Sequence, residues 1–62
     1  MKIYVYGMRL MGFAPMCQPI LNLVGRKDDI SGKYYDLLEY DKPLTERDMQ
    51  EYELDFIEEY ML

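Results

Sequence analysis

Three carboxylates in the middle of the chain are of a residue type that could hold a divalent metal ion. Asp28 and Asp29 are adjacent, and Asp36 follows after a short polar stretch. Carboxylate oxygens suit a hard cation such as Mg²⁺, which can assist cleavage of a phosphodiester bond. Their spacing matches no cation-binding loop signature, and aspartate is also a common turn residue. We therefore interpret Asp28 and Asp29 as turn residues that neutralise nearby Lys and Arg side chains. Metal-dependent DNA nicking or phosphodiester hydrolysis is the alternative function.

The sequence offers few side chains that could carry out nucleophilic catalysis. Cys17 is the single cysteine and histidine is absent, so no imidazole is present to activate the thiol. A free cysteine is among the most buried residue types, and we interpret Cys17 as an inert, buried thiol. The same composition leaves no intrachain disulfide and no structural zinc site in one protomer. We assign no catalytic residue, no metal ligand and no cofactor, and expect a protein that works by binding.

Basic and aromatic side chains in the first half of the chain could contact nucleic acid or another partner. Single-strand binders combine cations that follow phosphates with aromatic rings on which bases stack. Lys2, Tyr4 and Tyr6 alternate along one face of a strand predicted at residues 2–6, and we expect that face to be open. The alternative is that these tyrosines cover a core or a dimer surface. The candidate contact residues are Lys2, Tyr4, Tyr6, Arg9, Arg26 and Lys27.

The charges are sorted by position along the chain. Residues 1–27 hold four basic and no acidic side chains, whereas residues 28–62 hold all twelve carboxylates and three basic side chains, for a net charge of −5. Such asymmetry predicts contact between the two halves, within a protomer or across an interface. A helix is predicted over about residues 45–61, and the carboxylates on one of its faces could also imitate duplex phosphates in the cationic groove of a nucleic-acid enzyme. These carboxylates are Asp48, Glu51, Asp55, Glu58 and Glu59.

The elements that must position these residues form an α+β fold in one small domain, residues 1–62. We expect a three- or four-stranded antiparallel sheet over about residues 2–40, followed by one C-terminal amphipathic helix over about 45–61. Ser31 and Gly32 predict a hairpin turn before a strand at 33–40, and a second strand is expected at 8–11 and another at 20–24. Between them, Phe13 and Met16 of an uncharged loop at 12–19 are expected to plug the core.

The predicted helix has a clear start and an unfavourable end. Thr45 is the expected N-cap, with Asp48 three residues on in a variant capping box, and Leu44 and Met49 occupy the positions of a hydrophobic staple. Carboxylates crowd the other end, where the helix dipole favours cations. Its aromatic stripe would pack on the sheet. The apolar flank left over for a neighbouring protomer is Leu54, Ile57 and Met61.

A chain of 62 residues has a thin core, and small folds often gain stability from a partner subunit. Surplus Tyr and Met, which interfaces favour, support the same expectation of a homo-oligomer. A single cysteine, no secretory leader and no apolar run near the ~20 residues of a membrane span predict a cytoplasmic protein with no membrane segment.

Several short segments resemble a known group of proteins. Residues 1–10 (MKIYVYGMRL), 12–15 (GFAP), 18–19 (QP) and 31–36 (SGKYYD) resemble short uncharacterised proteins of Gram-positive bacteria and their mobile elements. The order of strands and helix is also similar to that of small anti-CRISPR proteins that assemble as oligomers. The resemblance implies no active site. It implies a non-catalytic accessory factor of a mobile element, acting against host defence on nucleic acid or on a nucleic-acid enzyme. A pure oligomerisation module is a further alternative.

Overall fold

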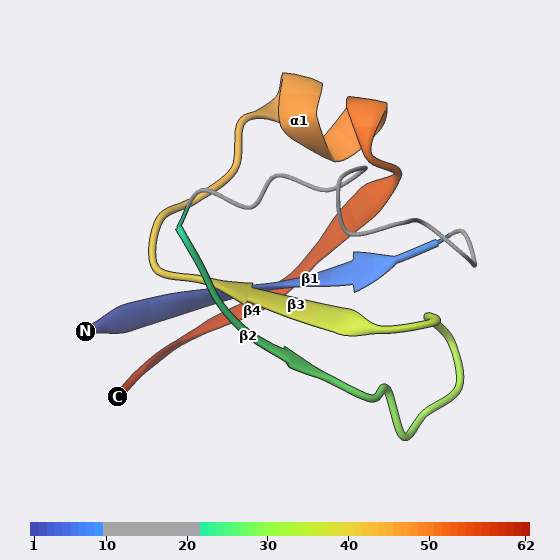
Figure 1. The fold of residues 1–62 in the computed structure, drawn as a ribbon, viewed down its shortest axis with the longest axis horizontal. Coiled ribbons are helices and arrows are strands. Elements are labelled where there is room, and N and C mark those ends of the chain that lie inside the picture. The colour runs from blue at the N-terminus through green and yellow to red at the C-terminus, as the bar shows by residue number, and fades with distance from the viewer. Residues whose placement is uncertain (10–21) are drawn as a thin grey trace.

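The computed structural model describes residues 1–9 and 22–62, which form an antiparallel sheet and one short helix. The strands are β1 (Lys2–Met8), β2 (Leu23–Lys27), β3 (Leu37–Tyr40) and β4 (Leu54–Met61), and α1 (Glu46–Glu51) lies between β3 and β4. The spatial order is β2-β3-β1-β4, so the N-terminal strand is central and the C-terminal strand forms an edge. Figure 1 shows α1 above the sheet and the two chain ends side by side.

The predicted fold class is wrong at its C-terminal element. The antiparallel sheet is present, but the chain is mostly β and has no C-terminal amphipathic helix. The helix begins as predicted, because the Thr45 side chain accepts a hydrogen bond from the Asp48 backbone N–H at 3.1 Å. It ends after six residues, and Glu53 then adopts the left-handed conformation with φ +56° that commonly ends a helix.

Residues 54–61 form a strand because pairing with β1 outweighs their local helical pattern. Tyr52, Phe56 and Tyr60 recur every fourth residue, a spacing that places side chains on one face of a helix and equally on one face of a strand. β4 pairs with β1 along its length, from Lys2 with Met61 to Met8 with Leu54. A bulge opposite Val5 and Tyr6 then turns successive parts of β4 to different faces.

The core lies on the face of the sheet that carries Tyr4, Tyr6 and Met8, which we call the first face. Tyr6, Met8, Leu38, Tyr40 and Leu54 form one buried cluster, and side chains from the α1 region pack against it. The Tyr6 ring meets the Tyr40 and Phe56 rings edge to face, and its hydroxyl accepts a hydrogen bond from the Leu44 N–H at 2.8 Å. Burying side chains of this size stabilises the fold by ~1.5–3 kcal/mol each. The face that was expected to be open is therefore the core face.

The predicted hairpin around the turn at Ser31 and Gly32 is confirmed, with shifted boundaries. β2 and β3 are antiparallel neighbours, and Arg26 and Lys27 belong to β2 rather than to the connection. Residues 33–36 belong to the loop rather than to the following strand. Asp29 organises this loop by accepting hydrogen bonds from the Ser31 hydroxyl at 2.7 Å and the Tyr34 N–H at 2.8 Å. Gly32 has φ +77°, a conformation that favours glycine.

Several predictions fall outside the described residues. These are the second strand beyond Arg9, the uncharged loop at 12–19 with Phe13 and Met16, the buried thiol of Cys17 and the beginning of the strand at 20–24. In the part of the chain that the structure describes, no helix is long and apolar enough to cross a membrane.

Candidate functional site

The four basic side chains of residues 1–27 are all paired with carboxylates of the second half of the chain. The expected contact between the two halves is thus confirmed within one protomer. Each paired side chain is partly exposed to water, so each pair contributes ~0–1 kcal/mol and mainly orients the strands. The pairs are Lys2–Glu59 at 3.7 Å, Arg9–Glu53 at 3.1 Å, Arg9–Asp55 at 3.3 Å, Arg26–Asp36 at 2.9 Å and Lys27–Glu39 at 3.5 Å.

Two of these pairs belong to clusters on the face opposite the Tyr6 cluster. This face carries Ile3, Val5 and Gly7, of which Ile3 and Val5 are buried, and we call it the second face. In the first cluster the Tyr34 hydroxyl donates to Asp55 Oδ2 at 2.9 Å, and the same carboxylate meets Arg9. The Tyr34 ring covers Gly7 so closely that a Cβ there would lie 2.5 Å from the ring. The hydrogen bond to the carboxylate raises the pKa of Tyr34. The phenol therefore stays neutral in the ordinary pH range.

The second cluster repeats this arrangement at the other end of the same face. The Tyr60 hydroxyl donates to Glu39 Oε2 at 2.5 Å, and Lys27 lies 3.5 Å from the same oxygen. Lys27 also sits 5.9 Å from the centre of the Tyr60 ring. Gly25 leaves room for the carboxylate, because a Cβ at that position would lie 2.6 Å from Glu39 Oε1. The hydrogen bond to Glu39 raises the pKa of Tyr60.

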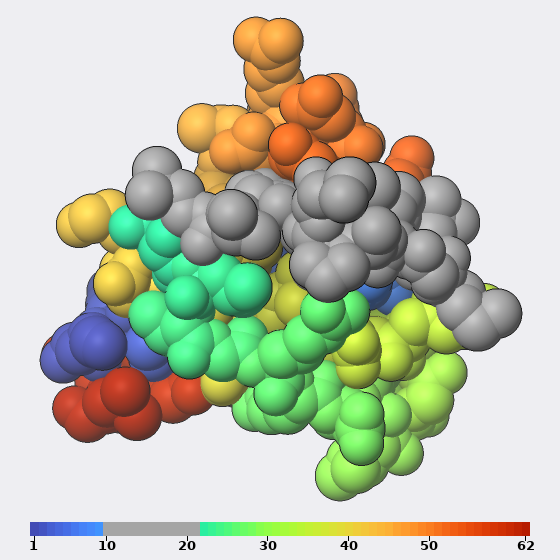
Figure 2. Space-filling model, viewed as in Figure 1, coloured from blue at the N-terminus to red at the C-terminus, as the bar shows by residue number. Residues whose placement is uncertain are grey.

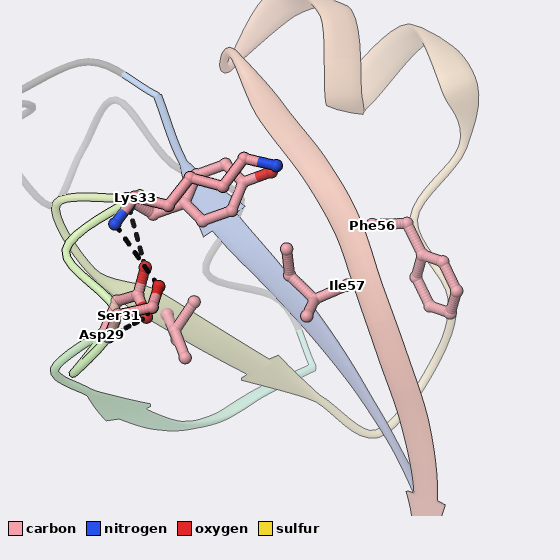
Figure 3. Close-up of a pocket in the computed structure, with 7 residues that line it drawn as sticks. Asp29, Ser31, Lys33, Phe56 and Ile57 are labelled. Atoms are coloured by element: carbon pink, nitrogen blue, oxygen red, sulfur yellow. Dashed lines mark hydrogen bonds between the residues drawn. The ribbon is translucent and has the colours of Figure 1, made fainter.

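A shallow depression of about 370 Å³ lies between the β2–β3 loop and β4. Figure 3 shows Ile57 pointing from β4 towards the loop residues Asp29 and Ser31, while Phe56 points to the other side of the strand. Lys33 contributes a cation, whose nitrogen lies 5.5 Å from the centre of the Tyr34 ring. Hydrogen bonds within the loop, first from the Ser31 hydroxyl, lower the pKa of Asp29. The depression is a mixed surface of apolar and polar groups rather than an enclosed site.

The three aspartates considered for a metal site are not brought together as ligands. Asp29 is committed to the loop hydrogen bonds, and Asp36 accepts from the Arg26 side chain at 2.9 Å. Asp28 is exposed next to them. Over residues 1–9 and 22–62, no three Asp, Glu, His or Cys side chains are grouped so that they could hold a metal ion. Asp29 has the predicted turn role, but the predicted neutralisation of nearby cations is made by other residues, since Arg26 pairs with Asp36 and Lys27 with Glu39.

The residues chosen as partner contacts lie in different environments. Tyr6 is 2 % exposed and its hydroxyl is used by Leu44, while Tyr4 is half-buried against the core. Lys2, Arg9, Arg26 and Lys27 lie at the surface in the pairs given above. A stacking platform of Tyr4 and Tyr6 beside free cations is therefore not what the fold presents. Contact of the surface cations with a partner stays a prediction.

The residues predicted for an oligomer interface lie on β4 instead of on a helix. Leu54 is 2 % exposed in the chain's own core and is not available to a neighbour. Ile57 is 38 % and Met61 67 % exposed, on the edge strand of the sheet. Self-association stays a prediction.

The carboxylates that were expected on one helix face are divided between α1 and β4. Asp55 and Glu59 are engaged by Arg9 and Lys2, so the predicted row of phosphate-like charges does not form. In the described residues, one set of carboxylates has no ion pair or hydrogen bond through its side chain. Its members are Asp28, Asp41, Glu46, Asp48, Glu51 and Glu58.

The two tyrosine–carboxylate clusters were missed by the sequence reasoning. The register of the sheet brings Tyr34 of the loop to Asp55 of β4, and Tyr60 of β4 to Glu39 of β3, although these residues are distant in the sequence. The available signal was Gly7 and Gly25, because an isolated glycine in a strand marks a close approach of another group. Neither glycine identifies which group approaches.

Comparison with known families identifies the family of this chain. The family described as "Defence against restriction A C-terminal" matches residues 1–59. No curated protein and no solved structure matches the chain significantly. The match supports neither a Gram-positive origin nor a relation to anti-CRISPR proteins.

Proposed function

The chain belongs to the family described as defence against restriction A C-terminal, and on this premise we propose that it is a non-catalytic accessory protein that protects a mobile element from restriction. The family description supports the general role of evading host defence. It leaves open whether the molecule contacts nucleic acid or the enzyme that attacks it. The distribution of charge supports the second choice.

The observation that carries this choice is that the basic groups near the N-terminus are already occupied. Binding to nucleic acid gains most of its free energy from cations that replace the counterions of phosphates. Here Lys2, Arg9, Arg26 and Lys27 each lie within 4 Å of a carboxylate of the same chain. Moving them to phosphates would leave those carboxylates unpaired, on a molecule whose net charge is already −5.

The remaining free charge is predominantly negative. The unpaired carboxylates Glu46, Asp48 and Glu51 lie on α1, which stands out from the sheet at the top of the molecule in Figure 2. A second depression of about 270 Å³ lies beside them, between α1 and β4. A surface of this charge attracts a cationic partner, and enzymes that bind DNA carry cationic grooves. We therefore propose a nucleic-acid enzyme of the host as the target.

The test combines a restriction assay with a DNA-binding assay. We expect the purified protein to reduce cleavage of unmodified DNA by a restriction enzyme of a host cell, and to shift neither single- nor double-stranded DNA at low salt. Glu51→Lys should weaken the inhibition several-fold. Asp28→Lys, the same charge change in the β2–β3 loop, should leave it unchanged.

Two results would contradict the proposal. Unchanged cleavage at saturating protein would remove the anti-restriction role. Salt-sensitive DNA binding with normal inhibition would move the target from the enzyme to the nucleic acid.

A further inference from the structure

The outer edge of β4 is the longest unpaired strand edge in the described part of the chain. β4 runs over eight residues, and the sheet order places it next to β1 alone. The opposite edge, β2, runs over five residues. An exposed strand edge carries a row of N–H and C=O groups that can pair with another chain, and proteins usually shorten or cover such edges.

The register shows which backbone groups of β4 face outwards. The Leu62 N–H donates to the Met1 carbonyl at 2.8 Å, and hydrogen-bonded pairs alternate with non-bonded pairs along an antiparallel ladder. Glu59 and Met61 therefore direct their N–H and C=O groups away from β1. On the other side of the bulge, the Arg9 N–H to Glu53 carbonyl bond at 3.1 Å gives Phe56 the same outward direction. The edge thus offers donors and acceptors on both sides of the bulge.

Both faces of this edge carry apolar or aromatic and acidic side chains, because Glu59 lies on the first face between Phe56 and Met61, and Tyr60 lies on the second face beside Glu58. Phe56 is 50 % and Met61 67 % exposed, although both belong to the face that elsewhere carries the core. Glu58 projects from the second face and has no partner among the described residues. β4 contains three carboxylates and no basic residue. Because Glu59 is already paired with Lys2 and Asp55 with Arg9, a partner strand would meet exposed apolar groups on the first face and the unpaired charge of Glu58 on the second face.

We propose that the β4 edge binds an extended, basic segment of a partner protein, which adds to the sheet as a fifth strand. Strand addition of this kind gains affinity from main-chain hydrogen bonds and specificity from alternate side chains. Charge decides against a second copy of β4, because pairing two such strands would bring six carboxylates onto one ladder, and like charges across strands are destabilising. The proposal rests on the proposed function only in taking the partner to be a protein.

The geometry also predicts the pattern of the incoming strand. Residues that point towards Phe56 and Met61 should be apolar, and the alternate residues, which point towards Glu58, should be Lys or Arg. The bulge at Ile57 interrupts a regular ladder, so the pairing should be strongest over residues 58–61.

The experiment uses a synthetic ten-residue peptide of alternating Val and Lys, titrated into the isotope-labelled protein. We expect saturable binding, with amide hydrogen exchange slowed at least tenfold at Glu59 and Met61 and little changed at Ile3, whose amide already faces β4. A peptide of alternating Val and Glu should not bind. N-methylation of the Val–Lys peptide on its strand-facing amides should abolish binding, whereas N-methylation on its outer amides should not.

Two variants of the protein test whether peptide binding depends on an outward N–H group of β4. Glu59→Pro removes an outward N–H at an edge position that tolerates proline and should abolish peptide binding. Glu59→Gln keeps that N–H and should weaken binding only a few-fold. The tyrosine signals of the core monitor folding in both, and the N-methylated peptides give the same information with the unchanged protein.

Three results would overturn the inference. They are binding of the Val–Lys peptide without protection of the Glu59 and Met61 amides, no binding at low salt, and self-association that protects the same amides in the absence of peptide. Because the restriction assay contains no peptide, failure here leaves the proposed anti-restriction role standing, and failure of that assay leaves the strand pairing standing.

Discussion

Both faces of the sheet bury apolar side chains, but the tyrosine–carboxylate clusters lie on the second face alone among the described residues. On the first face, Tyr6, Leu38 and Tyr40 are almost completely removed from water and pack against one another. On the second face, Ile3 and Val5 are also buried, and the hydroxyls of Tyr34 and Tyr60 donate to carboxylates that also meet cations. Burial of apolar area is worth more than a partly exposed hydrogen bond, of which the net value is ~0.5–1.5 kcal/mol. Burial on both faces therefore provides most of the stability, and the polar clusters of the second face fix the position of the β2–β3 loop.

The largest expected loss of stability comes from creating a cavity in the first face. Leu38→Ala removes a side chain that is 0 % exposed, and such substitutions cost about 2–5 kcal/mol. A domain of this size has a total stability of only a few kcal/mol, so the variant should be largely unfolded at 25 °C. Urea unfolding followed by circular dichroism measures the change.

Ile30→Ala is the matched control, because Ile30 is fully exposed and its truncation should change the unfolding free energy by less than ~0.5 kcal/mol. Equal losses for the two variants would show that burial of Leu38 on the first face does not contribute to the stability.

A smaller loss of stability is expected from adding a methyl group where the second face is crowded. In Gly7→Ala the new Cβ would lie 2.5 Å from Tyr34 Cγ, so the ring must move away and its hydrogen bond to Asp55 must break. Overpacking of this kind costs about 1–3 kcal/mol. Gly25→Ala is the matched control, since its Cβ meets only the end of the flexible Glu39 side chain and should cost less. Thermal unfolding compares the two, and a larger loss for Gly25→Ala would contradict the arrangement of the second face.

The same contrast explains which parts of the structure the sequence could predict. The start of α1 was predictable, because Thr45 and Asp48 make the cap through neighbouring residues. Its end was not, because the spacing of Phe56 and Tyr60 fits a helix and a strand equally well, and the choice depends on the partner β1. The carboxylates crowded at the end of the predicted helix were a signal against it, since a strand has no comparable dipole.

The candidate site was also predictable only in part. Sorting of charge along the chain predicted correctly that the two halves meet, because residues 1–27 hold four basic side chains and no carboxylate, so their cations could pair only with carboxylates of the second half. It could not predict that Tyr6 is buried while Tyr34 and Tyr60 form the polar clusters. That depends on which face of β1 receives the α1 region, and on a register between strands that are distant in the sequence.

The smallest expected effect separates the tyrosines of the two faces by their titration. Burial raises the pKa of Tyr40 on the first face to about 12, whereas a hydrogen bond to Glu39 raises the pKa of Tyr60 on the second face. A raised pKa favours the neutral phenol in the folded state. The stability linked to each group is therefore fully present below pH 10 and is lost as the pH rises through the folded-state pKa.

Glu39→Gln should distinguish the two causes. It removes the charged acceptor, so Tyr60 should titrate closer to its ordinary value of 10, while Tyr40 stays raised until the protein unfolds. Tyrosinate absorbance against pH, with near-ultraviolet circular dichroism to report unfolding, measures both groups. Tyr60→Phe identifies the Tyr60 contribution. If Glu39→Gln lowers every tyrosine pKa equally, the variant has loosened the whole fold, and the two faces are not independent.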